Sequence, residues 1–128
     1  MELRKGTETV MVVDDEAMVK DLARDILKRY GYTVLTAGGG EEAVELYRKY
    51  RESIALVVLD ILMPDMDGRE AFRRIRAFDP SAKIIVSSGF DQARDADDLL
   101  REGASAFVQK PYRIAELVRA VGEVIERS

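Results

Sequence analysis

Side chains able to take part in polar chemistry follow four of the five short apolar segments in this chain. Asp14 and Asp15 come after the first segment, and Asp60 comes after the third. Ser88 and Lys110 stand at the ends of the fourth and fifth. Histidine and cysteine are both absent. Carboxylates, hydroxyls and lysine must therefore do any chemistry, and metal sites built on imidazole or thiolate are excluded.

These residue types together favour phosphoryl chemistry assisted by a metal ion. Three clustered carboxylates repel one another unless a cation joins them. Mg²⁺ is a natural partner, because it prefers oxygen ligands and usually takes one or two carboxylates together with phosphate oxygens. A carboxylate nucleophile can form an aspartyl phosphate. Lys110 could offset charge on the phosphoryl oxygens as a compact cation, and Ser88 could donate a hydrogen bond to one of them.

The hydrophobic pattern predicts the elements that would bring these residues together. Apolar, valine-rich segments are expected to be strands at residues 9–13, 32–37, 55–59, 83–87 and 105–109. Helical periodicity predicts helices at residues 17–30, 41–52, 69–78, 91–102 and 114–125. The alternation predicts a single α/β domain with a doubly wound, five-stranded parallel sheet and five helices. Working sites in such sheets lie at the carboxyl ends of the strands.

Length and composition limit the remaining choices. The 128 residues suit one domain, for which we expect a lead or linker at residues 1–8 and the folded unit at 9–128. The net charge of −4 argues against direct nucleic-acid binding. The longest apolar run, residues 54–59, is far shorter than the ~18 residues that a membrane span needs. We therefore expect a cytoplasmic protein without membrane insertion.

Four motifs at the predicted strand ends give the sequence a family resemblance. They are Val-Val-Asp-Asp-Glu at 12–16, Asp-Ile-Leu-Met-Pro-Asp-Met-Asp-Gly at 60–68, Val-Ser-Ser-Gly at 86–89 and Lys-Pro-Tyr at 110–112. With these motifs the chain, from about Thr9 onward, closely resembles the receiver domain of two-component response regulators of the chemotaxis-regulator type. The resemblance implies a flavodoxin-like sheet of order 2-1-3-4-5. It also implies a phosphoacceptor switch, with no enzymatic activity beyond slow self-dephosphorylation.

The resemblance also implies roles for individual residues. Asp60 corresponds to the phosphorylated aspartate. Asp14 and Asp15 would hold Mg²⁺ together with Asp60 and the backbone carbonyl of Leu62. Lys110 would pair with Asp60 or its phosphate.

Two further residues correspond to conformational switch positions of the family. Ser88, rather than Ser87, matches the switch Ser/Thr, and Phe107 matches the aromatic switch. A buried aromatic in a strand is also ordinary core, so both interpretations of Phe107 remain open. Pro111 suggests a cis peptide after Lys110.

The resemblance also implies a phosphoryl donor, a phosphohistidine on a histidine kinase or histidine phosphotransfer domain. That domain must be a separate one, because this chain has no histidine. Residues 6–9 and 103–112 also look like those of receivers at the C-terminus of hybrid histidine kinases. The isolated domain is expected to be a monomer or a weak homodimer.

Three other interpretations fit the residues less well. A hydrolase of the haloacid-dehalogenase kind needs a second aspartate two residues after the nucleophile, where Leu62 stands. A flavin or nucleotide binder would need a phosphate-cradling loop in place of Asp14-Asp15-Glu16. Asp14 and Asp15 could also merely cap a helix.

Leu62 and Phe90, both apolar, would hinder an attacking water, so we expect a long-lived phosphoryl group.

Overall fold

The computed structural model describes residues 5–89 and 93–127. Its five strands are β1 (Thr9–Val13), β2 (Thr33–Ala37), β3 (Ile54–Asp60), β4 (Ile84–Ser88) and β5 (Ala106–Gln109). They form one parallel sheet of order β2-β1-β3-β4-β5. Parallel neighbours need crossover connections, and the alternating helices supply them. The predicted fold class and strand order are confirmed.

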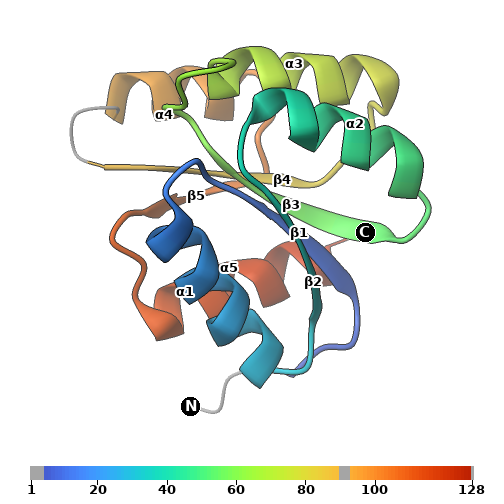
Figure 1. Cartoon of the computed structure of the whole chain (residues 1–128), viewed down its shortest axis with the longest axis vertical. Helices are drawn as coiled ribbons and strands as arrows, with labels where there is room; N and C mark the ends of the chain where they lie inside the picture. Colours follow the sequence, from blue (N-terminus) through green and yellow to red (C-terminus); the bar gives the residue numbers. More distant parts are fainter. Residues whose placement is uncertain (1–4, 90–92, 128) are drawn as a thin grey trace.

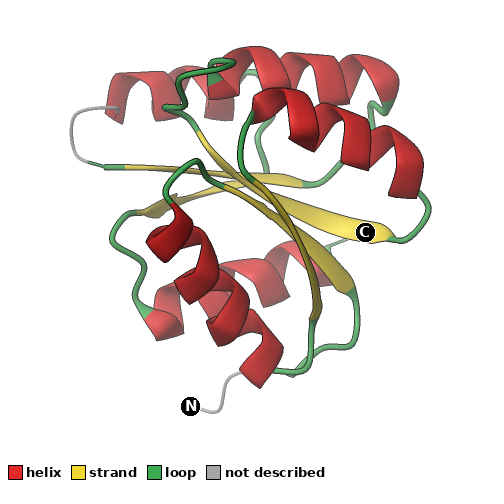
Figure 2. Ribbon diagram, viewed as in Figure 1, coloured by secondary structure: helices red, strands yellow, loops and turns green. Residues whose placement is uncertain are grey.

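Four helices connect successive strands: α1 (Ala17–Arg29), α2 (Gly40–Tyr50), α3 (Gly68–Phe78) and α4 (Ala93–Arg101). A fifth described helix, α5 (Ile114–Glu126), follows β5. Figure 1 shows α2, α3 and α4 on one face of the sheet and α1 and α5 on the other. The strands lie between these two helical layers, as Figure 2 also shows. Both faces of the sheet are thus covered, which explains why its strands read as continuous apolar segments.

The core is divided by the sheet into two apolar clusters. One cluster contains Phe72 of α3 and Leu99 of α4. The other contains Leu27 of α1 and Leu117 of α5. Alternate residues of each strand enter opposite clusters: in β3, Val57 and Leu59 belong to the first, and Leu56 and Val58 to the second. This two-sided burial holds the strand ends rigidly in register.

Most predicted boundaries lie within two residues of those observed. α1 ends at Arg29, and Gly31 follows with φ of 98°, a left-handed conformation that suits glycine. β3 and β4 each end one residue later than predicted, because Asp60 pairs with Ser87 and Ser88 pairs with Gln109 in the ladder. Of the fourth predicted helix, Asp91 and Gln92 lie outside the described residues.

Residues 5–8 contact the domain ahead of β1. Gly6 N–H donates to Tyr30 O at 2.9 Å, and Thr33 N–H donates to Glu8 O at 3.0 Å. Gly6 also packs so closely on the ring of Tyr32 that a Cβ there would clash with a ring carbon. The boundary between lead and domain at residue 9 remains a proposal. In the described part of the chain, no helix has the length and apolar character needed to cross a bilayer.

Candidate functional site

The parallel strands bring their carboxyl ends to a single edge of the sheet. Asp14 is the first residue after β1, while Asp60 and Ser88 are the last residues of β3 and β4. Lys110 follows β5 directly. The structure therefore collects at one edge the side chains that the sequence places at separate strand ends.

Three carboxylates form the centre of this site. Oxygens of Asp14, Asp15 and Asp60 all lie within 4.8 Å of one another. Asp14 and Asp60 are buried, whereas Asp15 is exposed. Asp14 Oδ1 accepts a hydrogen bond from Glu16 N–H at 2.9 Å, which fixes that carboxylate in the turn after β1. The arrangement can hold a hard cation by its carboxylate oxygens, with Asp15 on the solvent side.

Lys110 joins the two buried carboxylates. Its Nζ donates to Asp14 Oδ2 at 2.9 Å and lies 3.2 Å from Asp60 Oδ2. Glu16 Oε1 is further away, at 3.6 Å. The Lys110–Pro111 peptide bond is cis, and Lys110 N–H donates to Ser88 O at 2.8 Å. The family resemblance implied Asp60 or its phosphate as the partner of this lysine, and the structure adds Asp14 as the closer one.

The charges of these groups leave the site short of positive charge. Burial, followed by the negative charge of Asp14, raises the pKa of Asp60 to about 6, and Lys110 only partly opposes this rise. Burial lowers the pKa of Lys110, but its hydrogen bond to Asp14 and the charge of Asp60 outweigh this and raise the pKa above its usual value. Lys110 is thus an ammonium facing two buried carboxylates. The donor set fits Mg²⁺, which would supply the missing positive charge.

The two serines at the end of β4 have different environments. Ser87 Oγ accepts a hydrogen bond from the Tyr112 hydroxyl at 2.9 Å, in a buried contact. Ser88 is 1% exposed, and its Oγ has no hydrogen-bond partner among the described residues. A buried hydroxyl without a partner is costly, so Ser88 is suited to donate to an incoming group at this edge.

Several other predicted residues lie around this centre. Leu62 is two residues beyond Asp60, and its side chain is 64% exposed. Its N–H donates to Asp60 Oδ1 over a long 3.4 Å. The use of its carbonyl as a metal ligand stays a prediction.

Phe107 in β5 is 36% exposed. At this exposure it is not a buried core side chain, so that alternative does not fit the structure. Its role as a switch stays a prediction. Phe90 lies outside the described residues.

Two contacts near the site were missed from the sequence. The Asp65 carboxylate, in the β3–α3 loop, accepts from Gly40 N–H and Glu41 N–H at 3.2 Å each, and so caps α2. A Cβ at Gly39 would lie 2.6 Å from that carboxylate. The second contact, Tyr112 to Ser87, links the β5–α5 loop to β4. A run of glycines before a helix was the only signal of the first contact, and it did not identify a partner 25 residues away.

Comparisons with known proteins agree with this geometry. The family described as "Response regulator receiver domain" matches residues 10–122. The chemotaxis protein CheY of Thermotoga maritima is 38% identical over 116 residues, which cover 90% of this chain and 95% of that protein.

Solved structures show the same likeness. A response regulator receiver domain protein from Clostridium thermocellum superposes with a TM-score of 0.90 at 28% identity, covering 94% of this chain and 95% of that one. The CheX–CheY–BeF3–Mg²⁺ complex from Borrelia burgdorferi contains a chain with a TM-score of 0.88 at 33% identity, covering 94% of this chain and 90% of that one.

Proposed function

This chain belongs to the response regulator receiver domain family, and we propose that Asp60 is the residue on which it accepts a phosphoryl group. Receiver domains are the phosphoacceptors of two-component signalling systems, so the general function follows from membership. The observation that supports Asp60 is the set of neighbours around it: Asp14, Asp15 and Lys110 all lie at its carboxylate, and Ser88 has an unused hydroxyl nearby.

In the proposed reaction, a carboxylate oxygen of Asp60 attacks the phosphorus of a phosphohistidine on a partner kinase or phosphotransfer domain. The new O–P bond forms as the P–N bond breaks, and the imidazole leaves with its electron pair. Asp60 must be ionised to attack, and its pKa of about 6 leaves it mostly charged at neutral pH. Lys110 and Ser88 then donate to the phosphoryl oxygens and offset their charge.

Asp14, Asp15 and Asp60 would hold Mg²⁺ by carboxylate oxygens, with the Leu62 carbonyl as a further ligand. Bound there, the ion would neutralise the carboxylates and the phosphoryl oxygens. The Borrelia CheX–CheY complex, one chain of which is similar to this one, contains BeF3 and Mg²⁺, which supports Mg²⁺ as the ion. The chain itself supplies Lys110, already held within 3.2 Å of both Asp14 and Asp60 before any ligand arrives.

After transfer, we propose that Ser88 turns toward the phosphoryl group and that Phe107, on the neighbouring strand, changes its exposure. The unused hydroxyl of Ser88 and the partial exposure of Phe107 support this two-state change. Slow self-dephosphorylation would be the chain's only catalytic activity. A cytoplasmic location and monomeric or weakly dimeric state remain predictions.

The direct test is incubation of the protein with acetyl phosphate and Mg²⁺, followed by intact mass measurement. We expect the mass of one phosphoryl group on the wild type and none on Asp60→Asn. Asp67→Asn is the matched control, because Asp67 lies in the loop that follows Asp60 and asparagine can still cap α3. Removal of Mg²⁺ with EDTA should abolish labelling. Equal labelling of wild type and Asp60→Asn would end the proposal.

A second experiment tests Ser88. Ser88→Ala should retain labelling of Asp60 but lose the fluorescence or NMR change that beryllofluoride with Mg²⁺ produces near β4. Ser87→Ala serves as the control, because Ser87 is already bonded to Tyr112. If Ser87→Ala removes that change and Ser88→Ala does not, the two serines have been assigned the wrong way round.

A further inference from the structure

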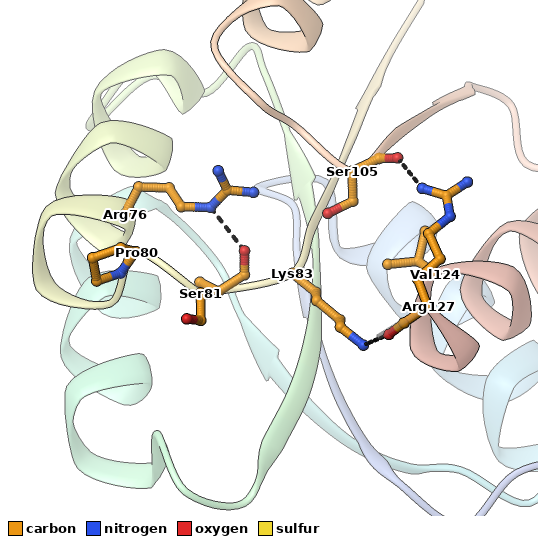
Figure 3. A pocket seen from close by; sticks show the side chains of 8 residues that line it. Arg76, Pro80, Ser81, Lys83, Ser105, Val124 and Arg127 are labelled. Carbon is orange, nitrogen blue, oxygen red and sulfur yellow. Dashed lines mark hydrogen bonds between the residues drawn. The ribbon is translucent and has the colours of Figure 1, made fainter.

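A second hollow lies at the opposite edge of the sheet, where β4 and β5 begin. It has a volume of about 460 Å³ and lies between the α3–β4 connection and the end of α5. Figure 3 shows Arg76 reaching into it from the side of α3 and Arg127 from the end of α5. Ser105, before β5, and Lys83, before β4, stand between them. The hollow is therefore separate from the site around Asp60.

Three of the lining side chains are cationic, and none is acidic. Arg76, Lys83 and Arg127 form no ion pair with any carboxylate among residues 5–89 and 93–127. This is unusual in a chain whose net charge is −4. The arginines on the outer side of α3 behave differently, since Arg73 pairs with Glu102 and Arg74 with Glu70.

The cations are instead held by neutral backbone carbonyls. Arg76 donates to Ala82 O at 2.7 Å and to Gly103 O at 2.8 Å. Lys83 Nζ donates to Ile125 O at 3.1 Å and Arg127 O at 2.7 Å. These contacts fix the positions of the charges but do not neutralise them. An arginine has five N–H donors and a lysine three, so donors remain for a ligand.

Arg127 adds to this set from the end of α5. Its Nη1 donates to Ser105 O at 2.7 Å, and the rest of the guanidinium makes no other hydrogen bond to the described residues. A guanidinium held by one nitrogen keeps a fork of N–H groups that matches the geometry of a phosphate. The hydroxyls of Ser81 and Ser105 also line the hollow. The Ser105 side-chain oxygen, Oγ, accepts a hydrogen bond from Ile84 N–H at 3.1 Å, which leaves the hydroxyl proton of Ser105 to donate.

Burial makes the charge on Arg76 unfavourable. Desolvation lowers the pKa of Arg76, and Tyr47 and Asp79 only partly oppose this. Asp79 is occupied elsewhere, because it accepts from the Tyr47 hydroxyl at 2.7 Å and lies 3.7 Å from Arg51. An anion in the hollow would therefore relieve a cost that the protein's own carboxylates leave in place.

From these contacts, we propose that the hollow lined by Arg76, Lys83 and Arg127 is a binding site for a phosphate-bearing small molecule. Phosphate is favoured over a single carboxylate because two arginines and a lysine, from different elements, line the same hollow. The volume exceeds that of one phosphate group. Pro80 and Val124 provide apolar walls that could contact the rest of the ligand. Such a ligand would bridge the α3–β4 connection and the end of α5.

The site can be tested by NMR titration of the full chain, labelled with ¹⁵N, in EDTA so that Mg²⁺ cannot bring phosphates to Asp60. The probes are inorganic phosphate, pyrophosphate and ATP. We expect saturable shifts at the amides of Ser81, Lys83 and Ser105 and at the Nε–H groups of Arg76 and Arg127. Tighter binding of ATP than of pyrophosphate would identify a nucleotide, while equal binding would identify the phosphates alone.

Variants distinguish this site from general attraction to a cation. Arg127→Gln should weaken binding about tenfold, the effect of losing one strong charged hydrogen bond. Ser81→Glu should weaken it similarly, because it adds a negative charge while leaving the arginine–carbonyl contacts intact. Arg74→Gln is the control: Arg74 is also on α3 but pairs with Glu41 and Glu70, so binding should change less than about twofold.

Three results would overturn the proposal. One is the absence of saturable shifts at the lining residues with all three probes. Another is a set of shifts centred on Ser88 and Lys110 instead. The third is equal weakening by Arg74→Gln and Arg127→Gln, which would show that only the overall charge matters. All of these readouts are independent of phosphorylation at Asp60.

Discussion

Replacing Asp60 with asparagine should stabilise the protein in the absence of metal. Asp60 is 2% exposed, and burial beside Asp14 raises its pKa from 3.8 to about 6. Each unit of pKa corresponds to about 1.4 kcal/mol, so the charged form costs about 3 kcal/mol more in the folded than in the unfolded chain. Asparagine has the same shape without the charge. At pH 7.5 in EDTA, Asp60→Asn should therefore be more stable by up to about 3 kcal/mol.

The pH dependence gives the sign of this effect. Because the pKa of Asp60 is raised in the folded protein, its carboxyl group holds a proton more tightly when folded. The contribution of this proton to the free energy of unfolding is complete below pH 3.8. It is lost as the pH rises through about 6. The advantage of Asp60→Asn should thus be near zero at pH 3.8 and grow to its full value above about pH 7.

Urea unfolding at several pH values, followed by circular dichroism, would measure this difference. Asp21→Asn is the control: Asp21 is 48% exposed and pairs with Arg24 at the surface, so its replacement should change stability by less than about 1 kcal/mol. Added Mg²⁺ should stabilise the wild type far more than Asp60→Asn. The reasoning is refuted if Asp60→Asn is no more stable than wild type at pH 7.5 in EDTA.

Three further substitutions probe the surroundings of the site. Leu62→Asn should shorten the phosphoryl lifetime by about threefold or more, because a polar side chain would help to orient an attacking water; an unchanged autodephosphorylation rate, measured by loss of the phosphorylated mass, would contradict this. Tyr112→Phe should cost about 1 kcal/mol of unfolding free energy by removing the buried bond to Ser87, while Tyr50→Phe, at an exposed tyrosine, should cost almost nothing in the same urea titration. Asp65→Ala should weaken Mg²⁺ binding and destabilise the fold by about 1 kcal/mol, because it frees the β3–α3 loop from α2; calorimetric titration with Mg²⁺ would show this, and an affinity equal to wild type would show that the loop is held by other contacts.

Local patterns were sufficient for much of the fold. Continuous apolar segments such as residues 54–59 predicted buried strands, and the helical spacing of residues such as Leu117, Val118 and Val121 predicted α5. These patterns work because a strand covered on both faces must be apolar throughout, and a surface helix must bury one side. The predicted and observed ends of β3 and β4 differ by one residue. The last hydrogen bonds of the ladder, such as that from Ile61 N–H to Ser87 O, join segments far apart in sequence, and local patterns do not reveal them.

The sequence by itself determined which residues could do chemistry and at which edge of the sheet they would gather. Side chains at the carboxyl ends of parallel strands must meet, whatever their detailed packing. Only the tertiary structure decided which of these side chains contact one another. Lys110 lies closer to Asp14 than to Asp60. The side chain of Ser87 is hydrogen-bonded to Tyr112, while that of Ser88 has no hydrogen-bond partner among the described residues. The cationic hollow around Arg76 and Arg127 was likewise invisible, because its charges come from elements 51 residues apart that leave no common pattern along the chain.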